Sequence, residues 1–261
     1  MSNDNNKTNE DVNHSAEAPI DKASSINNVD ALSQYLKSAA GAREGRAIPP
    51  LDKWHPEDIA DMDLVIKANG EWWHEGGQMT RESLVSLFAT ILWKEENNGI
   101  TEYFLKTPVQ KIRIQVEDAP LLINDVGIVH EDDVSWLEFT TTTGDVVRLD
   151  DEHQITLQAY NPKNKDIAAP ADYSSNVKHN DLENENFNES LNSENMDHSK
   201  NVTTDEPVRP YMLVRNGLTA LIGRNTFYHL AEIGELTECN GETILTLRSG
   251  GQDYSLSMPA N

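Results

Sequence analysis

The stretch Asp63–Lys94, DLVIKANGEWWHEGGQMTRESLVSLFATILWK, decides the predicted fold. Leu64–Lys67 and Glu71–His74 are predicted strands. Asn69-Gly70 lies between them, and this dipeptide favours a two-residue type I′ hairpin turn, because both turn positions need positive φ. Thr80 is the predicted N-cap of a following helix. The apolar residues of that helix recur at i, i+3, i+4, i+7 and i+8: Leu84, Leu87, Phe88, Ile91 and Leu92.

Two later strands, Thr101–Lys106 and Val109–Val116, complete a ββ-α-ββ unit. A second unit is predicted near the C-terminus, where Asn216-Gly217 again separates two strands and precedes a short helix. Its elements are the strands Tyr211–Arg215 and Leu218–Ile222, a helix carrying Phe227, Leu230 and Ala231, and the strands Thr243–Arg248 and Gln252–Met258. The repeated order predicts an internal duplication, with Asn69-Gly70 equivalent to Asn216-Gly217.

Short strand candidates separated by turn residues fill the region between the two units: Leu121–Val129, Ser135–Thr142, Asp145–Leu149 and Gln154–Tyr160. Their spacing is typical of an antiparallel meander. The predicted fold is therefore α+β with mostly antiparallel sheets, built from two ββ-α-ββ units and a meander between them.

Composition divides the 261 residues into folded and unfolded parts. Only 37% of the residues are hydrophobic, and residues 1–46 and 161–206 contain few large apolar side chains. We expect a disordered tail over residues 1–46 with a short helix at residues 31–40. An N-terminal domain over residues 47–117 follows, and a C-terminal domain over residues 118–261 is interrupted by a disordered insert at 161–206.

The formal charge of −23 excludes whole classes of partner. Residues 1–46 carry −2 and residues 161–206 carry −6, which leaves −15 for the predicted folded part. Binding to a nucleic-acid polymer or to an anionic membrane relies on clustered Lys and Arg, so neither is expected. No long apolar run or signal peptide is present, and we expect a cytoplasmic protein. Cys239 is the single cysteine, so no internal disulfide can form.

Two arginines at predicted helix starts, Arg81 and Arg224, are the leading candidates for ligand binding. A cation at a helix N-terminus opposes the helix dipole at a cost of a few tenths of a kcal/mol. Free N–H groups beside a guanidinium can hold a phosphate or a carboxylate. The alternative is that each arginine pairs with a surface acid, such as Glu82 beside Arg81.

Other residues could line the same pocket. Arg215 and Lys67 precede the two Asn-Gly turns, although a solvated hairpin end is the alternative. Trp72, Trp73 and Tyr228 could stack on a base, but aromatic residues on a strand or helix more often belong to a core. We include His74 among the candidate ligand-binding residues.

No catalytic residue, metal site or cofactor is predicted. The acid and base candidates include His74-Glu75, Asp61 with Asp63, and Asp150-Asp151-Glu152. Glu117 and Asp118 are adjacent on a strand and should point to opposite faces, which makes a poor catalytic pair. Because no motif of a known enzyme class occurs, a non-enzymatic role is favoured, with an unrecognised hydrolase as an alternative.

Five segments of the chain resemble a bacterial family known only as domain of unknown function 1285. They are IPPLDKWHPE (48–57), DMDLVIKANGEWWHEG (61–76), TRESLVSLFATIL (80–92), YFLKTPVQKIRIQVEDAPLLI (103–123) and PYMLVRNGLTALIGRNTFYHL (210–230). The resemblance implies a duplicated core with a C-terminal domain loosely like the pleckstrin-homology fold. It also implies a nucleotide-like ligand between the domains and a role in signalling.

The leading hypothesis is therefore a non-enzymatic protein that binds a small anionic, nucleotide-like ligand between two domains and reports it to a protein partner. The alternative is a protein–protein interaction module that has no small ligand.

Overall fold

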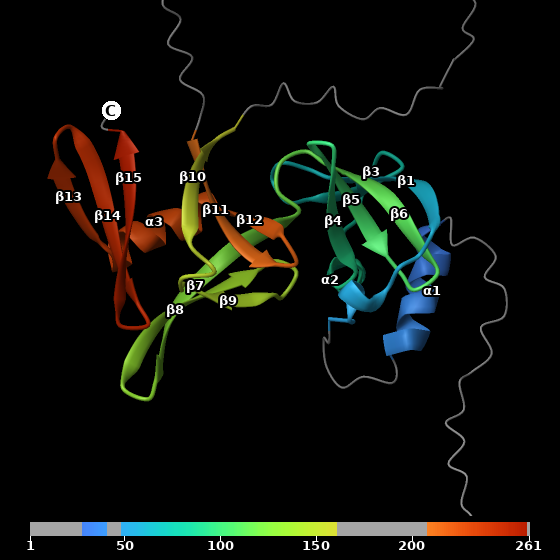
Figure 1. The fold of residues 1–261 in the computed structure, drawn as a ribbon, viewed down its shortest axis with the longest axis horizontal. Helices are drawn as coiled ribbons and strands as arrows, with labels where there is room; N and C mark the ends of the chain where they lie inside the picture. The colour runs from blue at the N-terminus through green and yellow to red at the C-terminus, as the bar shows by residue number, and fades with distance from the viewer. Residues whose placement is uncertain (1–27, 41–47, 161–207, 260–261) are drawn as a thin grey trace, which may run out of the picture.

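The computed structural model describes residues 28–40, 48–160 and 208–259, and the insert predicted over residues 161–206 lies outside these ranges (Figure 1). Most of the described residues form antiparallel strands, accompanied by short helices, which confirms the predicted α+β class. No helix in the described ranges is long and apolar enough to cross a membrane. The likeness to the pleckstrin-homology fold stays an expectation.

Helix α1 (Val29–Ala40) covers the helix predicted at residues 31–40. The Asn28 side chain accepts a hydrogen bond from the Ala31 N–H at 2.7 Å and caps its first turn. Leu32 and Leu36 are buried in the main apolar core, and the helix packs against α2 (Glu82–Ala89). This helix is therefore part of the folded body.

The first sheet contains β1 (Asp58–Ile66), β2 (Trp72–His74), β3 (Gly77–Gln78), β4 (Leu92–Asn97), β5 (Ile100–Lys106) and β6 (Gln110–Val116). Its strand order is β3-β2-β1-β6-β5-β4. β1 and β6 are parallel, and every other neighbouring pair is antiparallel. The sheet thus joins two three-stranded meanders through one central parallel pair, with α2 as the connection between the meanders.

The hairpin at Asn69-Gly70 is present, but its predicted turn type is wrong. Only Gly70 has positive φ (83°), and its N–H donates to the Lys67 carbonyl at 2.8 Å. The Lys67 N–H donates to the Glu71 carbonyl, which leaves a three-residue loop that ends in a left-handed glycine. A Cβ at Gly70 would lie 2.8 Å from the Leu122 Cβ, so this turn packs directly against the second sheet.

Helix α2 is shorter than predicted because the apolar stripe continues beyond it. The helix ends at Ala89, and the Thr90 hydroxyl donates to the Leu87 carbonyl at 2.7 Å. Ile91 and Leu92 are fully buried, but they lead into strand β4. The β4–β5 hairpin turns at Asn98-Gly99, where both residues have positive φ as in a type I′ turn.

The second sheet contains β7 (Leu121–Glu131), β8 (Val134–Thr141), β9 (Val146–Arg148), β10 (Ile155–Ala159), β11 (Val208–Arg215) and β12 (Leu218–Ile222). The four strands predicted between residues 121 and 160 are all present. The single meander is wrong, because β10 pairs with β11 at the far edge of the sheet from β9. Asn216 and Gly217 both have positive φ and form the turn of the β11–β12 hairpin.

The duplication is visible as a repeated sheet topology. The second sheet has the order β10-β11-β12-β7-β8-β9, with β12 and β7 parallel at its centre. In both sheets the first strand of one meander pairs with the last strand of the other. The second copy of the repeat that residues 58–116 form is therefore residues 121–222. We predicted that this copy lies at residues 211–258.

The predicted second ββ-α-ββ unit is divided between two sheets. Its hairpin belongs to the second sheet, and its last strands form a third sheet of β13 (Glu235–Cys239), β14 (Glu242–Ser249) and β15 (Gln252–Pro259). Helix α3 (Arg224–Ile233) connects the second and third sheets (Figure 1). The buried Ser249 hydroxyl joins them by donating to the Leu149 carbonyl at 2.7 Å and accepting from the Leu137 N–H at 3.0 Å.

Candidate functional site

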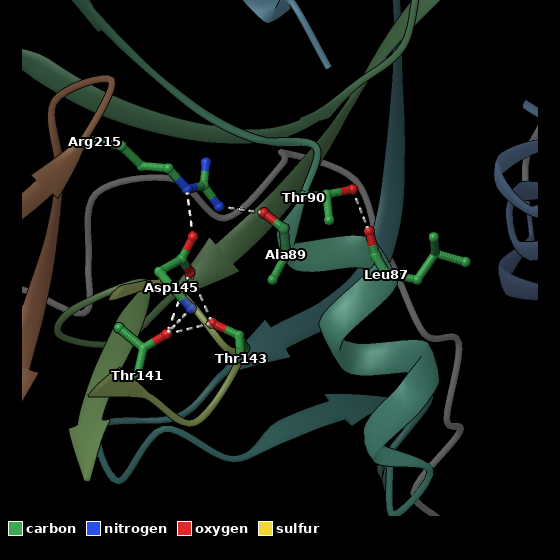
Figure 2. Close-up of polar contacts among 7 residues, drawn as sticks. All are labelled: Leu87, Ala89, Thr90, Thr141, Thr143, Asp145 and Arg215. Atoms are coloured by element: carbon green, nitrogen blue, oxygen red, sulfur yellow. Dashed lines mark hydrogen bonds and ion pairs between the residues drawn. The ribbon is translucent and has the colours of Figure 1, made fainter. Parts of the chain in front are cut away.

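A buried polar cluster centred on Arg215 joins the two six-stranded sheets. Arg215 ends β11, and its Nε donates to Asp145 Oδ1 at 2.8 Å within the second sheet. Its Nη2 donates to the Ala89 carbonyl at 2.6 Å, at the end of α2 in the other half of the chain (Figure 2). The Arg215 side chain is 14% exposed and that of Asp145 is 5% exposed, so this ion pair is largely removed from water.

Ala89 offers a favourable acceptor because of its place in α2. The last carbonyl groups of a helix have no partner within the helix and carry the negative end of its dipole. The Thr90 hydroxyl satisfies Leu87, and the Arg215 guanidinium satisfies Ala89. The cation is therefore placed where both the helix and Asp145 stabilise it.

Asp145 is held by the tight turn that precedes it. The Gly144 N–H donates to the Thr141 carbonyl, and Gly144 has a φ of 86°. The hydroxyls of Thr141 and Thr143 donate to Asp145 Oδ2 at 3.2 and 3.1 Å, and the Asp145 N–H donates to the Thr141 hydroxyl at 2.8 Å (Figure 2). These bonds fix the carboxylate before it meets Arg215.

One donor of this cluster has no acceptor. Arg215 Nη1 is fully buried, and no acceptor in the described part of the chain receives a hydrogen bond from it. A buried charged donor left unpaired costs more than the 1–3 kcal/mol typical of a neutral group. A bound acceptor oxygen would satisfy this donor, which makes the junction of the two six-stranded sheets a candidate ligand site.

A second set of ion pairs braces the link between the sheets. Glu117 pairs with Lys67 of the first sheet at 3.0 Å. Its neighbour Asp118 pairs with Arg209 at 2.7 Å and accepts from the Tyr211 hydroxyl at 2.7 Å, both in the second sheet. Burial, with the bond to Asp118, raises the pKa of Tyr211. We predicted that the two acids lie on one strand, but β6 ends at Val116. Glu117 contacts the first half of the molecule and Asp118 the second, so they tie the halves together.

The chain matches two models of known protein families. Residues 49–119 match the model described as domain of unknown function (DUF1285), N-terminal domain, and residues 189–256 match protein of unknown function (DUF1285), C-terminal domain. The chain belongs to the DUF1285 family. Comparison with curated proteins gives no match.

Two solved structures of DUF1285 proteins are similar to the chain. A DUF1285 family protein from Silicibacter pomeroyi DSS-3 is 27% identical with a TM-score of 0.56, covering 85% of this chain and 94% of that one. A DUF1285 family protein from Shewanella baltica OS155 is 24% identical with a TM-score of 0.37, covering 66% and 91%. The first of these supports a shared fold.

The arginines predicted at helix starts lie apart from the junction. Arg81 is the N-cap of α2 and is exposed, whereas Arg215 meets the other end of this eight-residue helix. At 1.5 Å per residue the two ends are about 12 Å apart. Arg224 begins α3 and is also exposed. Within the described ranges neither Arg81 nor Arg224 forms an ion pair, so the alternative pairing of Arg81 with Glu82 is absent.

The predicted aromatic and histidine residues do not converge either. Trp72 is 3% exposed and belongs to the apolar core, so its ring cannot stack on a ligand in this structure. His74 Nδ1 lies 2.7 Å from the Asp63 carbonyl. Tyr228 is exposed on α3. Of the predicted residues, Arg215 alone lies in the buried cluster between the sheets, and Lys67 pairs with Glu117 instead.

Asp145, Thr141 and Thr143 were not predicted as site residues. Thr141 lies in the predicted strand Ser135–Thr142, Asp145 begins the predicted strand Asp145–Leu149, and Thr143 lies in the turn between them. One signal was available: in the predicted strand Asp145–Leu149, Asp145 falls on the same side as Val147 and Leu149, and an acid on the inward side of a strand needs a cationic partner.

Proposed function

We propose that this DUF1285 protein is a non-enzymatic cytoplasmic protein that binds a small anionic ligand at the junction of its two six-stranded sheets. The ligand class is a nucleotide-like phosphate or a carboxylate. The observation that supports it is Arg215 Nη1, a buried guanidinium donor without an acceptor in the described residues. An anionic oxygen is the strongest acceptor that such a donor can meet.

Burial of this donor couples binding to a movement between the sheets. A ligand oxygen can reach Nη1 only if the contacts around Arg215 open, and one of these contacts, to Ala89, crosses between the two halves. The brace at Glu117 and Asp118 holds the halves together during such an opening. A ligand that changes the angle between the halves would present a changed surface to a protein partner, which is the basis for a role in signalling.

The test is a thermal-shift panel of nucleotides, inorganic phosphate and di- and tricarboxylates. A ligand at a hundred times its dissociation constant stabilises the folded state by about 2.7 kcal/mol, which shifts the melting temperature measurably. Arg215→Lys keeps the positive charge but replaces the planar fork by one ammonium, so it should abolish the shift. Arg248→Lys, at an exposed ion pair with Asp253, is the matched control and should keep it.

Two results would refute the proposal: no ligand of the panel shifts the wild-type protein, or Arg215→Lys shows the wild-type ligand shift. If Arg215→Lys alone melts at a lower temperature, the comparison still holds, because each variant is measured against its own ligand-free curve.

A protein-interaction role has its own supporting observation. β13 pairs only with β14 among the described strands, all five of its residues are exposed, and Leu236 on it is 52% exposed. An open edge of this kind can accept a strand from a partner. If this role holds, Leu236→Lys should abolish binding of a protein partner that wild type binds. Ile59→Lys, at a side chain of similar exposure (50%), is the control and should keep that partner.

A further inference from the structure

A cavity of about 250 Å³ lies between the second and third sheets, away from the Arg215 cluster. Trp136 of β8 and Tyr254 of β15 supply aromatic walls. The loop after β9 supplies three consecutive acids, Asp150, Asp151 and Glu152. The aromatic and acidic walls come from separate elements, so the cavity is a product of the tertiary fold.

Close packing at the β14–β15 turn fixes the position of the indole wall. Gly250 has a φ of 61°, and its N–H donates to the Ser135 carbonyl at 2.9 Å, which holds this turn against β8. A Cβ at Gly250 would lie 2.5 Å from the Trp136 ring. Glycine is therefore required for the turn to touch the indole where it does.

Hydrogen bonds also fix the acidic wall. Asp150 Oδ1 accepts from the backbone N–H groups of Glu152 and His153 and contacts the His153 ring at 2.8 Å. Burial opposes ionisation of Asp150, but the bonds from His153 and Glu152 outweigh it and hold the pKa of Asp150 below its usual value. The carboxylate is thus charged at neutral pH.

The cavity carries net negative charge because the neighbouring cations are already paired. Arg148 lies 5.5 Å from the Trp136 ring centroid and is bound by Glu131 and Glu138. Arg248 pairs with Asp253 at 3.1 Å. In the described ranges no basic side chain pairs with Asp151 or Glu152, the other two acids of the cavity. Burial and the charge of Asp151 raise the pKa of Tyr254, which keeps this phenol neutral.

We propose that this cavity binds a methylated ammonium group. Aromatic ring faces attract organic cations through their quadrupoles, and nearby carboxylates add charge attraction. Among the described residues no three His, Cys, Asp or Glu side chains are grouped closely enough to ligate a metal ion. A bulky ammonium head does not require three side chains grouped around one point, because it contacts ring faces and carboxylates at its periphery. The group can belong to a free molecule or to a methylated lysine of a protein.

Calorimetric titration of the full chain at low ionic strength tests this site with three probes. Choline represents the free cation, and trimethyllysine with blocked ends represents the protein-borne group. Dimethylbutanol, in which a neutral carbon replaces the choline nitrogen, is the neutral control. We expect millimolar binding of choline, of trimethyllysine or of both, and binding at least about fivefold weaker for the neutral probe.

Two sets of variants locate the binding. Asp151→Asn with Glu152→Gln should weaken binding of the cation about fivefold, since each exposed charge contributes a factor of about two on average and at most about five. Trp136→Leu should weaken it about threefold. The matched control is Glu57→Gln with Asp58→Asn, which removes the same two charges at exposed positions where β1 begins in the first sheet.

The proposal is overturned if neither cation binds at tens of millimolar, if the neutral probe binds as well as choline, or if the distant control weakens binding as much as the cavity pair. Circular dichroism of each variant establishes that it is folded. The exposed Asp151 and Glu152 variants keep the test decisive if Trp136→Leu fails to fold.

Discussion

Substitution of Gly70 by alanine should report directly on the contact between the two six-stranded sheets. Gly70 lies in the β1–β2 turn with a φ of 83°, and its Cα faces Leu122 of the second sheet. Gly99 in the β4–β5 turn has nearly the same φ, 81°, with nothing within 4 Å of the position of a Cβ. The pair therefore separates backbone strain from contact between the sheets.

The expected magnitudes follow from these two geometries. A left-handed alanine costs about 1 kcal/mol at either position. At Gly70 the new Cβ would also lie 2.8 Å from both Cβ and Cδ2 of Leu122 and 3.3 Å from its Cγ. Relief of such overpacking costs a further ~1–3 kcal/mol. Gly70→Ala should therefore lower the free energy of unfolding by about 2–4 kcal/mol, and Gly99→Ala by about 1 kcal/mol.

Urea denaturation followed by circular dichroism and tryptophan fluorescence measures both values. Leu122→Ala removes two of the three close atoms, so in the Gly70→Ala background it should show a favourable coupling of about 1 kcal/mol. Equal losses for Gly70→Ala and Gly99→Ala would refute the reasoning, because the two sheets would then not be in close contact at this turn.

Three further perturbations have defined outcomes. Burial, with the charges of Asp118 and Glu96, raises the pKa of Tyr103 from 10 to about 12, so stability should fall as pH rises from 10 to 12. Tyr103→Phe should flatten that part of the curve of stability against pH, and Tyr228→Phe should leave it unchanged. Asp118→Ala removes the shared partner of Arg209 and Tyr211 and should lower the free energy of unfolding, measured in urea, by about 3 kcal/mol. Asp253→Ala, at an exposed ion pair, should lower it by under about 1 kcal/mol. Similar losses for the two variants would contradict the bracing role of Asp118. Gly250→Ala should displace Trp136 and weaken choline binding, and Gly251→Ala, with a φ of 79° and open space around it, should preserve it; weaker binding in both would point to a turn that is merely strained.

Local patterns predicted the strands well and the turns unevenly. Both Asn-Gly hairpins that we predicted are present, but Asn69-Gly70 adopts a three-residue loop. The dipeptide fixes where the chain reverses, and the fit of Gly70 against Leu122 belongs to the tertiary structure. The hairpin at Asn98-Gly99 is harder to predict from the same dipeptide, because the apolar residues up to Leu92 fit a helix as well as the start of strand β4. A buried residue serves a helix or a strand equally, so the stripe could not show where α2 ends.

The candidate site depended on information that a single sequence does not carry. Arg215 could be predicted from its place before a turn, but its partners Asp145 and Ala89 are 70 and 126 residues away. The place of Trp72 depended on the fold for a related reason: alternation shows that one of the adjacent Trp72 and Trp73 faces inward, and only the packed structure shows that Trp72 does. The two cavity walls at Trp136 and Asp150 also meet only through the fold.

The central parallel pair of each six-stranded sheet has a consequence for the order of folding. In the first sheet it joins Asp58 to Gln110, 52 positions apart, and in the second it joins Leu121 to Ala220, 99 positions apart. This near doubling of loop length adds only about 0.6 kcal/mol of closure entropy. Contacts between distant positions nevertheless slow folding. During synthesis the first sheet has all of its strands once residue 116 has emerged, so it can form first and offer Gly70 and Ala89 as a surface on which the second sheet closes.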